Sequence, residues 1–109
     1  MSTPMQVNTT SEGEKQVVQV RGDVDMESSP RMLAEIQHNL RRGAAVEVDL
    51  ADVTDIDSAG VAVLVQGLKG ARKRGLNFRL RNLSKRVIAV LRLAHLLQLF
   101  QIDDPGAKG

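Results

Sequence analysis

The stretch VEVDLADVTDIDSAGV at residues 46–61 decides the fold, because within it a strand pattern passes into a helix pattern. Residues 46–50 alternate apolar and polar side chains, which is typical of a half-buried β-strand. Residues 51–57 predict a loop, and a helix is expected to begin near Ser58. A strand that leads into a helix in this way indicates an α/β sheet with parallel crossovers. The apolar side chains of the expected helix recur at helical spacing and are Val61, Leu64, Val65, Leu68 and Ala71.

Towards the N-terminus, the pattern predicts a hairpin and another helix. Residues 1–5 are expected to be frayed, and residues 6–10 and 16–21 are expected to pair as a β-hairpin across a polar turn. Ser29 and Pro30 are typical of a helix N-cap and a first helical position, so a helix is expected to begin there.

Towards the C-terminus, the alternation of strands and helices continues. Residues 76–81 predict a strand, and residues 82–84 lead into a third helix. Residues 96–102 are expected to close the domain. The expected order is therefore ββαβαβα with a terminal piece, and its crossovers place helices over a sheet.

The predicted fold class is α/β, with one domain over residues 1–109. Its core is expected at about residues 5–103, followed by a polar tail at 104–109. The expected architecture is a mixed β-sheet of about four to five strands with helices packed on it.

Composition excludes several kinds of site. The chain has 109 residues, of which 42% are hydrophobic, and it contains no Cys. A disulfide scaffold, a Cys-ligated zinc site and a thiol nucleophile are therefore excluded. The two His residues, His38 and His95, lie far apart in the chain, so no metal and no cofactor are expected.

Composition also narrows the location and the partners. No apolar run is long enough to cross a bilayer, and the opening MSTPMQVNTT lacks the basic and apolar regions of a signal peptide. We therefore expect a cytoplasmic protein without direct membrane insertion. Phe78 and Phe100 are the whole aromatic content, and base-stacking proteins need exposed aromatic side chains. No nucleic-acid partner is expected.

The formal net charge of +2 conceals a strong asymmetry along the chain. Residues 12–57 contain 11 acids and 5 bases, whereas residues 69–92 contain 9 bases and no acid. The basic segment 69–92 has two interpretations. It forms a surface for phosphate, an acidic protein or anionic lipid, or it is only a solvated helix end and the outer face of a strand.

Ser58 lies at the junction of the predicted strand and helix. A Ser hydroxyl there can cap the helix by accepting a backbone N–H, and the same place tolerates a phosphate dianion well. Ala59 and Gly60 are small, so a partner could approach the hydroxyl closely. A phosphate would add about −1.5 to −2 charge beside Asp55 and Asp57. We expect this to change the surface without a large refolding.

This segment also has other interpretations. An Asp-Ser pair before a helix, taken without the rest of the sequence, is most often only a helix cap. The G-x-S-x-G elbow of Ser hydrolases and the phosphate-binding P-loop are both absent from the sequence. The carboxylates Asp49, Asp52, Asp55 and Asp57 could suggest a Mg²⁺ site, but their spacing does not match an EF-hand loop, and they are interpreted as solvated loop acids. No catalytic residue is expected, and the protein is not expected to be an enzyme.

Taken together, the motifs resemble a STAS domain, and more narrowly a bacterial anti-sigma factor antagonist. The resemblance covers roughly residues 5–103. It rests on four pieces in the right order, which are VRGDVD at 20–25, the opening stretch at 46–61, FRL at 78–80, and a closing part from LSKRV at 83–87 to LFQI at 99–102.

The resemblance implies a partner-switching mechanism. The unphosphorylated antagonist binds an anti-sigma factor serine kinase and so releases the sigma factor. The kinase supplies ATP and Mg²⁺ and phosphorylates the Ser of the Asp-Ser-x-Gly motif, here Ser58, and a PP2C-type phosphatase resets the cycle. By resemblance, Asp25 and Asp57 are the acids next to the acceptor. A monomer is expected, and the residues expected to contact the partner are Asp23, Asp25, Asp55, Ile56, Asp57, Ser58, Ala59, Gly60 and Val61.

Two alternatives share this fold. One is a STAS accessory subunit bound to the ATPase of a phospholipid-transport ABC system, and the other is a partner switch with a non-sigma output. Ser58 within an intact Asp-Ser-Ala-Gly favours a phosphorylated regulator, whereas the basic second half of the chain favours a position close to a membrane. The sequence does not distinguish a sigma factor from another output.

Overall fold

Apolar side chains bring two central strands together in the middle of the molecule. β2 (Lys15–Val24) and β3 (Ala45–Ile56) pair in parallel along almost their whole length. Val18 and Val48 face each other in this register, and both are fully buried. Since both strands are rich in Val, their β-branched side chains fit the pleated, buried surface.

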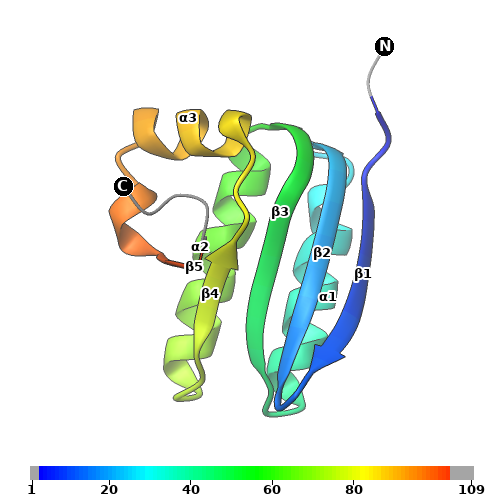
Figure 1. The fold of residues 1–109 in the computed structure, drawn as a ribbon, viewed down its shortest axis with the longest axis vertical. Coiled ribbons are helices and arrows are strands. Elements are labelled where there is room, and N and C mark those ends of the chain that lie inside the picture. The colour runs from blue at the N-terminus through cyan, green and yellow to red at the C-terminus, as the bar shows by residue number, and fades with distance from the viewer. Residues whose placement is uncertain (1–2, 104–109) are drawn as a thin grey trace.

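Three further strands complete a mixed sheet. The structure is a computed structural model that describes residues 3–103, so the predicted tail at 104–109 lies outside the described residues. β1 (Gln6–Glu12) pairs antiparallel to β2, which confirms the predicted hairpin. β4 (Phe78–Arg81) and the short β5 (Gln101–Asp103) extend the sheet in parallel, and the strand order is β1-β2-β3-β4-β5 (Figure 1). The predicted mixed α/β architecture is confirmed, with five strands.

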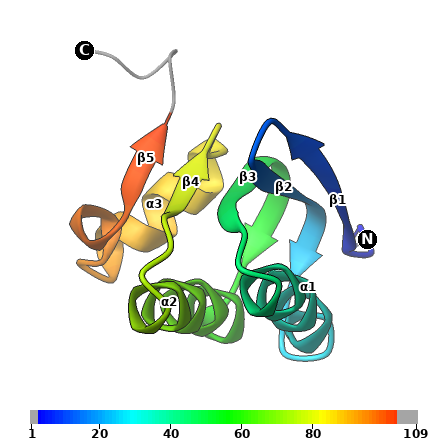
Figure 2. The same ribbon diagram turned by 90° about the horizontal axis from the view of Figure 1, so that it is seen from below.

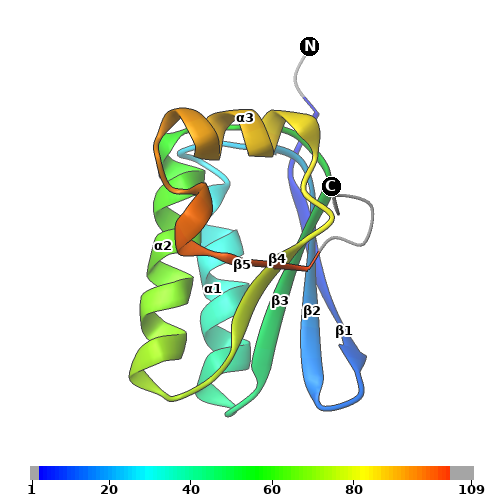
Figure 3. The same ribbon diagram turned by 60° about the vertical axis from the view of Figure 1, so that its left-hand side comes forward.

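The helices cover one face and one end of the sheet. α1 (Ser29–Arg41) and α2 (Ser58–Lys73) lie side by side on the same face (Figure 2). α3 (Lys85–Leu93) crosses the end at which β3 leads into α2, and a 3₁₀ turn, η1 (Leu97–Leu99), follows it (Figure 3). Among the described residues, no helix is both long enough and apolar enough to span a bilayer.

β3 is longer than its sequence pattern indicates. The predicted loop at 51–57 is wrong for residues 51–56, which continue the strand and pair with β2. The register with β2 shifts twice, and each shift inserts an extra residue into β3. The buried side chains Leu50, Val53 and Ile56 are therefore three residues apart instead of two, and the usual alternation is lost.

Two smaller corrections concern element ends. The N-cap of α1 is Ser28 and not Ser29, and Ser29 is buried as the first helical residue. The strand expected at 76–81 begins at Phe78, because residues 76–77 belong to the connection from α2.

The first described residues are held by the sheet and are not frayed. The backbone N–H of Asp23 donates to the carbonyl of Thr3 at 2.8 Å, and the Met5 side chain is buried. Gly22 has φ of +85°, and a Cβ there would lie 2.3 Å from the carbonyl oxygen of Pro4. Only glycine permits this close approach, which fixes the backbone just before Asp23.

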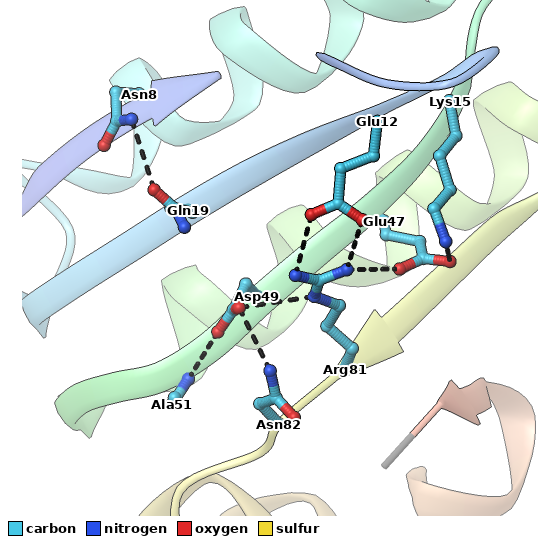
Figure 4. A network of polar contacts seen from close by, with 9 residues as sticks. All are labelled: Asn8, Glu12, Lys15, Gln19, Glu47, Asp49, Ala51, Arg81 and Asn82. Carbon is cyan, nitrogen blue, oxygen red and sulfur yellow. Dashed lines mark hydrogen bonds and ion pairs between the residues drawn. The ribbon is translucent and has the colours of Figure 1, made fainter. Parts of the chain in front are cut away.

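An ion-pair network closes the sheet face that lies away from α1 and α2 (Figure 4). Arg81 donates to both carboxylate oxygens of Glu12 at 3.0 and 3.1 Å, and it also contacts Glu47 and Asp49, each at 3.3 Å. Lys15 donates to Glu47 at 2.8 Å. These contacts raise the pKa of Arg81, chiefly through the hydrogen bonds to Glu12. The network matters because Glu47 is only 3% exposed and needs partners for its charge.

We expect Arg81→Met to lower the free energy of unfolding by about 2–3 kcal/mol, because buried Glu47 keeps Lys15 as its single cationic partner. Arg79→Met is the matched control, since Arg79 lies two residues earlier on the same strand and forms no ion pair within residues 3–103. Urea unfolding of both variants measures the difference. Equal losses would contradict a structural role for the network.

Candidate functional site

The predicted site lies at the carboxyl ends of the parallel strands β2 and β3. Val24 pairs with Ile56 at the end of the ladder, and the N–H of Asp57 donates to the carbonyl of Val24 at 3.1 Å. This bond joins the turn after β2 to the start of α2. In open α/β sheets, binding sites form at such strand ends because the loops that follow the strands meet there.

Asp57 is the residue that caps α2. Its Oδ1 accepts from the backbone N–H groups of Ala59 at 2.9 Å and Gly60 at 3.2 Å. The expectation that the Ser58 hydroxyl caps the helix is therefore wrong, because Ser58 is already the first helical residue. The Ser58 side chain is exposed, and its hydroxyl makes no hydrogen bond to any residue between 3 and 103. The hydroxyl is thus free for chemistry.

Asp25 organises the turn between β2 and α1. Its Oδ1 accepts from the N–H of Glu27 at 3.1 Å, from the N–H of Ser28 at 2.9 Å and from the Ser28 hydroxyl at 3.0 Å. Hydrogen bonds from the backbone and the hydroxyl of Ser28 hold the pKa of Asp25 below its ordinary value. The carboxylate therefore stays ionised and holds the turn beside the start of α2. Met26, at the tip of this turn, is 76% exposed.

Asp23 connects three segments of the chain. Its carboxylate accepts from the hydroxyl of Thr54 on β3 and, at 3.2 Å, from the backbone N–H of Thr3. The side chain is half-buried, in contrast to exposed Asp25. Asp23 therefore supports the site structurally as well as contributing charge to it.

Asp55 is paired with a base that is distant in the sequence. Arg86 Nε donates to Asp55 Oδ1 at 2.8 Å, and both side chains are 56% exposed. This hydrogen bond is the main cause that holds the pKa of Asp55 below its ordinary value. Arg86 was not predicted as a site residue from the sequence. Arg86 is 31 residues from Asp55 in the chain, and only the packing of α3 across the strand ends brings the two side chains together.

The predicted contact residues divide into exposed and buried groups. Asp25, Asp55, Asp57 and Ser58 are exposed, Asp23 and Ala59 are half-buried, and Ile56, Gly60 and Val61 are buried. The last three support the site from inside the core. The core leaves no room for a side chain at Gly60, since a Cβ there would lie 2.6 Å from Ile56 Cγ1 and 2.8 Å from Val24 Cγ1. The interpretation that Gly60 makes room for a partner is therefore wrong.

The exposed groups at this edge include the carboxylates, the hydroxyls of Ser58 and Thr54, the Arg86 guanidinium and the Met26 side chain. Within residues 3–103, no group of three His, Cys, Asp or Glu side chains has a metal-binding arrangement. His38 and His95 are both exposed, and they lie on α1 and just after α3 respectively. The Ser58 hydroxyl is accessible on a fixed helix terminus, at the same edge as the exposed carboxylates of Asp25, Asp55 and Asp57. Such a hydroxyl can accept a chemical group that another protein transfers to it.

A family model described as "Mlab, STAS domain" matches residues 7–101 of the chain. This chain belongs to the STAS domain family. The anti-sigma-B factor antagonist of Bacillus subtilis is 29% identical to this STAS domain over 92 residues, which cover 84% of each chain.

Solved structures of similar proteins have the same fold. An anti-sigma factor antagonist from Mycobacterium paratuberculosis superposes with a TM-score of 0.83 at 21% identity, covering 94% of this chain and 89% of that one. The Bacillus cell fate determinant SpoIIAA in its phosphorylated form superposes with a TM-score of 0.71 at 18% identity, covering 93% and 90%.

We expect Gly60→Ala to lower the free energy of unfolding by about 1–3 kcal/mol, because the new methyl group overlaps Ile56 and Val24. Gly70→Ala lies on the same helix, and its Cβ meets only Leu40 at an ordinary 3.5 Å. That control is expected to gain about 0.5–1 kcal/mol from helix propensity. Thermal and urea unfolding test the pair, and a Gly60 variant as stable as its control would refute the internal role of Gly60.

Proposed function

We propose that this STAS domain is an anti-sigma factor antagonist that is switched by phosphorylation of Ser58. The unphosphorylated form binds an anti-sigma factor serine kinase and releases the sigma factor, and phosphorylation ends the binding. The observation that carries the proposal is the free Ser58 hydroxyl in the first turn of α2, beside a helix cap that Asp57 supplies. The Bacillus subtilis relative, an anti-sigma-B factor antagonist, supports the same function.

The separate cap explains how the switch can act without unfolding the domain. The contacts at the start of α2 use Asp57 and the backbone, so a group added to Ser58 breaks none of them. The amino end of a helix also favours negative charge, which offsets repulsion from Asp55 and Asp57. Phosphorylation of Ser58 therefore changes the charge of the surface and leaves the fold unchanged.

The effect on the partner follows from desolvation. A protein that covers Ser58 removes water from the surrounding carboxylates, and an added dianion is then buried without a free counter-charge, since Arg86 is already paired with Asp55. Leaving one charge buried and unpaired costs about 4 kcal/mol, which weakens binding roughly a thousandfold.

The other parts of the cycle belong to the partners. The kinase supplies ATP and Mg²⁺, and a PP2C-type phosphatase removes the phosphate, so the chain itself acts as substrate and ligand in the cytoplasm. It needs no cofactor of its own, and a monomer is sufficient. On this proposal, contact is made chiefly by the exposed carboxylates and Ser58, with Ile56, Gly60 and Val61 holding them in place from below.

We expect Ser58→Ala to bind the kinase as tightly as the wild type and Ser58→Asp to bind at least about tenfold more weakly. Calorimetry with the purified kinase measures the affinities, and mass spectrometry after incubation with ATP locates the phosphate. Ser11→Asp adds the same charge on β1 and should bind normally. Equal affinities for Ser58→Ala and Ser58→Asp, or a phosphate on another residue, would refute the switch.

A second candidate is the accessory subunit of a phospholipid-transport ABC system. It is favoured by the description of the matching family model, which names Mlab and not an antagonist. Affinity purification from cells distinguishes the two functions. The first predicts a small serine kinase bound more strongly by Ser58→Ala than by Ser58→Asp, whereas the second predicts an ABC ATPase. A kinase whose target is not a sigma factor would indicate a partner switch with another output.

A further inference from the structure

Unpaired bases gather at the end of the molecule opposite Ser58. Lys15, Arg21, Arg81 and Arg86 form ion pairs within the sheet or at the predicted site. Nine other bases are exposed, and none of them forms an ion pair with a residue between 3 and 103. Arg31, Lys85 and Arg92 lie elsewhere on α1 and α3, and the remaining six lie at this end. This set, called here the basic end, comprises Arg41, Arg42, Lys69, Arg72, Lys73 and Arg74.

The packing of two parallel helices brings these bases together. α1 and α2 run in the same direction and finish at the same end of the molecule (Figures 1 and 3). Their last turns touch, since a Cβ on Gly70 would lie 3.5 Å from Leu40 Cδ1. After each of these helices the chain turns sharply at a glycine with positive φ, Gly43 or Gly75, so the bases before each turn lie at this end of the molecule.

Helix electrostatics explains part of this set but not all of it. The negative end of a helix dipole favours bases, but the effect falls off within the last turn. Arg72 and Lys73 lie in the last turn of α2, whereas Lys69 lies about one turn earlier. The turn between β1 and β2 reaches the same end of the molecule (Figure 1) and carries Glu14, while Glu12 beside the turn is paired with Arg81, so the six bases outnumber the free acid there.

The end that carries Ser58 differs from the basic end because acids and bases are mixed there. Asp25, Glu27, Asp55 and Asp57 lie at this end, and α3, which crosses it, adds Lys85, Arg86 and Arg92. Lys73 ends α2, which is 16 residues long and therefore separates the two ends by about 24 Å. This distance exceeds the Debye length of about 8 Å at physiological salt, so charge at one end is screened from the other.

We propose that the basic end binds the surface of an anionic phospholipid bilayer. The exposed ends of two adjacent helices form a broad cationic surface, which complements a planar anionic one. Single-stranded nucleic acid fits less well, because Phe78 and Phe100, the only aromatic residues, are 3% and 6% exposed and cannot stack on bases. When the basic end lies on the bilayer, Ser58 lies at the other end of α2, about 24 Å away, and stays accessible.

This inference is independent of the proposed function. A phosphate on Ser58 lies beyond the screening distance from the basic end, so binding to lipid should not depend on phosphorylation. Each base near an anionic surface contributes roughly fivefold to the affinity.

The test is sedimentation of the full chain with vesicles containing about 30 mol% phosphatidylglycerol in phosphatidylcholine, at about 50 mM salt and at higher salt. We expect binding that weakens as salt rises and is lost without phosphatidylglycerol. The double variant Arg72→Gln/Arg74→Gln should bind about 25-fold more weakly. The matched control Lys85→Gln/Arg92→Gln removes the same charge from α3 and should change binding by less than about twofold.

Ser58→Asp is also expected to bind the vesicles normally, which distinguishes this proposal from the kinase switch. The proposal is overturned if the wild type does not sediment at low salt or binds pure phosphatidylcholine equally well. An equal loss in both double variants would show an effect of net charge alone. Tighter binding of duplex DNA than of vesicles would assign the basic end to nucleic acid instead.

Discussion

The parallel pairing of β2 with β3, continued to their last residues, is the constraint on which the site depends. It ends in the hydrogen bond from the Asp57 N–H to the Val24 carbonyl, which joins two turns more than 30 residues apart. Without this pairing, the turn held by Asp25 and the first turn of α2 would have no fixed relation. The pairing is stable because apolar side chains from both strands are buried beneath it, while Gly22 lets the N-terminal segment pack against its edge.

At the start of α2, one residue caps the helix and the next residue carries the exposed hydroxyl. Asp57 satisfies the free N–H groups of the helix, and Ser58 is left exposed without a structural task. A hydroxyl that also capped the helix would couple any modification to the stability of α2. Since the two tasks fall on neighbouring residues, the surface at Ser58 can change while the backbone beneath it stays the same.

The basic segment at 69–92 is divided among three places in the structure. Arg81 closes the outer face of the sheet, Arg86 joins Asp55 at the predicted site, and the bases from Lys69 to Arg74 form part of the basic end. Neither interpretation from the sequence included the ion pairs of Arg81 and Arg86, and the interpretation of the segment as a binding surface stays a prediction. A run of like charge in a sequence is separated in space when its residues belong to different elements, here the end of α2, the strand β4 and the helix α3.

The sequence by itself determined the hairpin, the alternation of strands and helices, and the exposed serine near the start of α2. These features depend on short-range periodicity and turn chemistry, which a linear pattern preserves. Only the tertiary structure decided that β3 continues through residues 51–56, that Gly60 faces the core, and that Arg86 meets Asp55. Each of these depends on neighbours from other elements. Two register shifts hide the strand periodicity, and contacts between residues some 30 positions apart leave no periodic trace in the sequence.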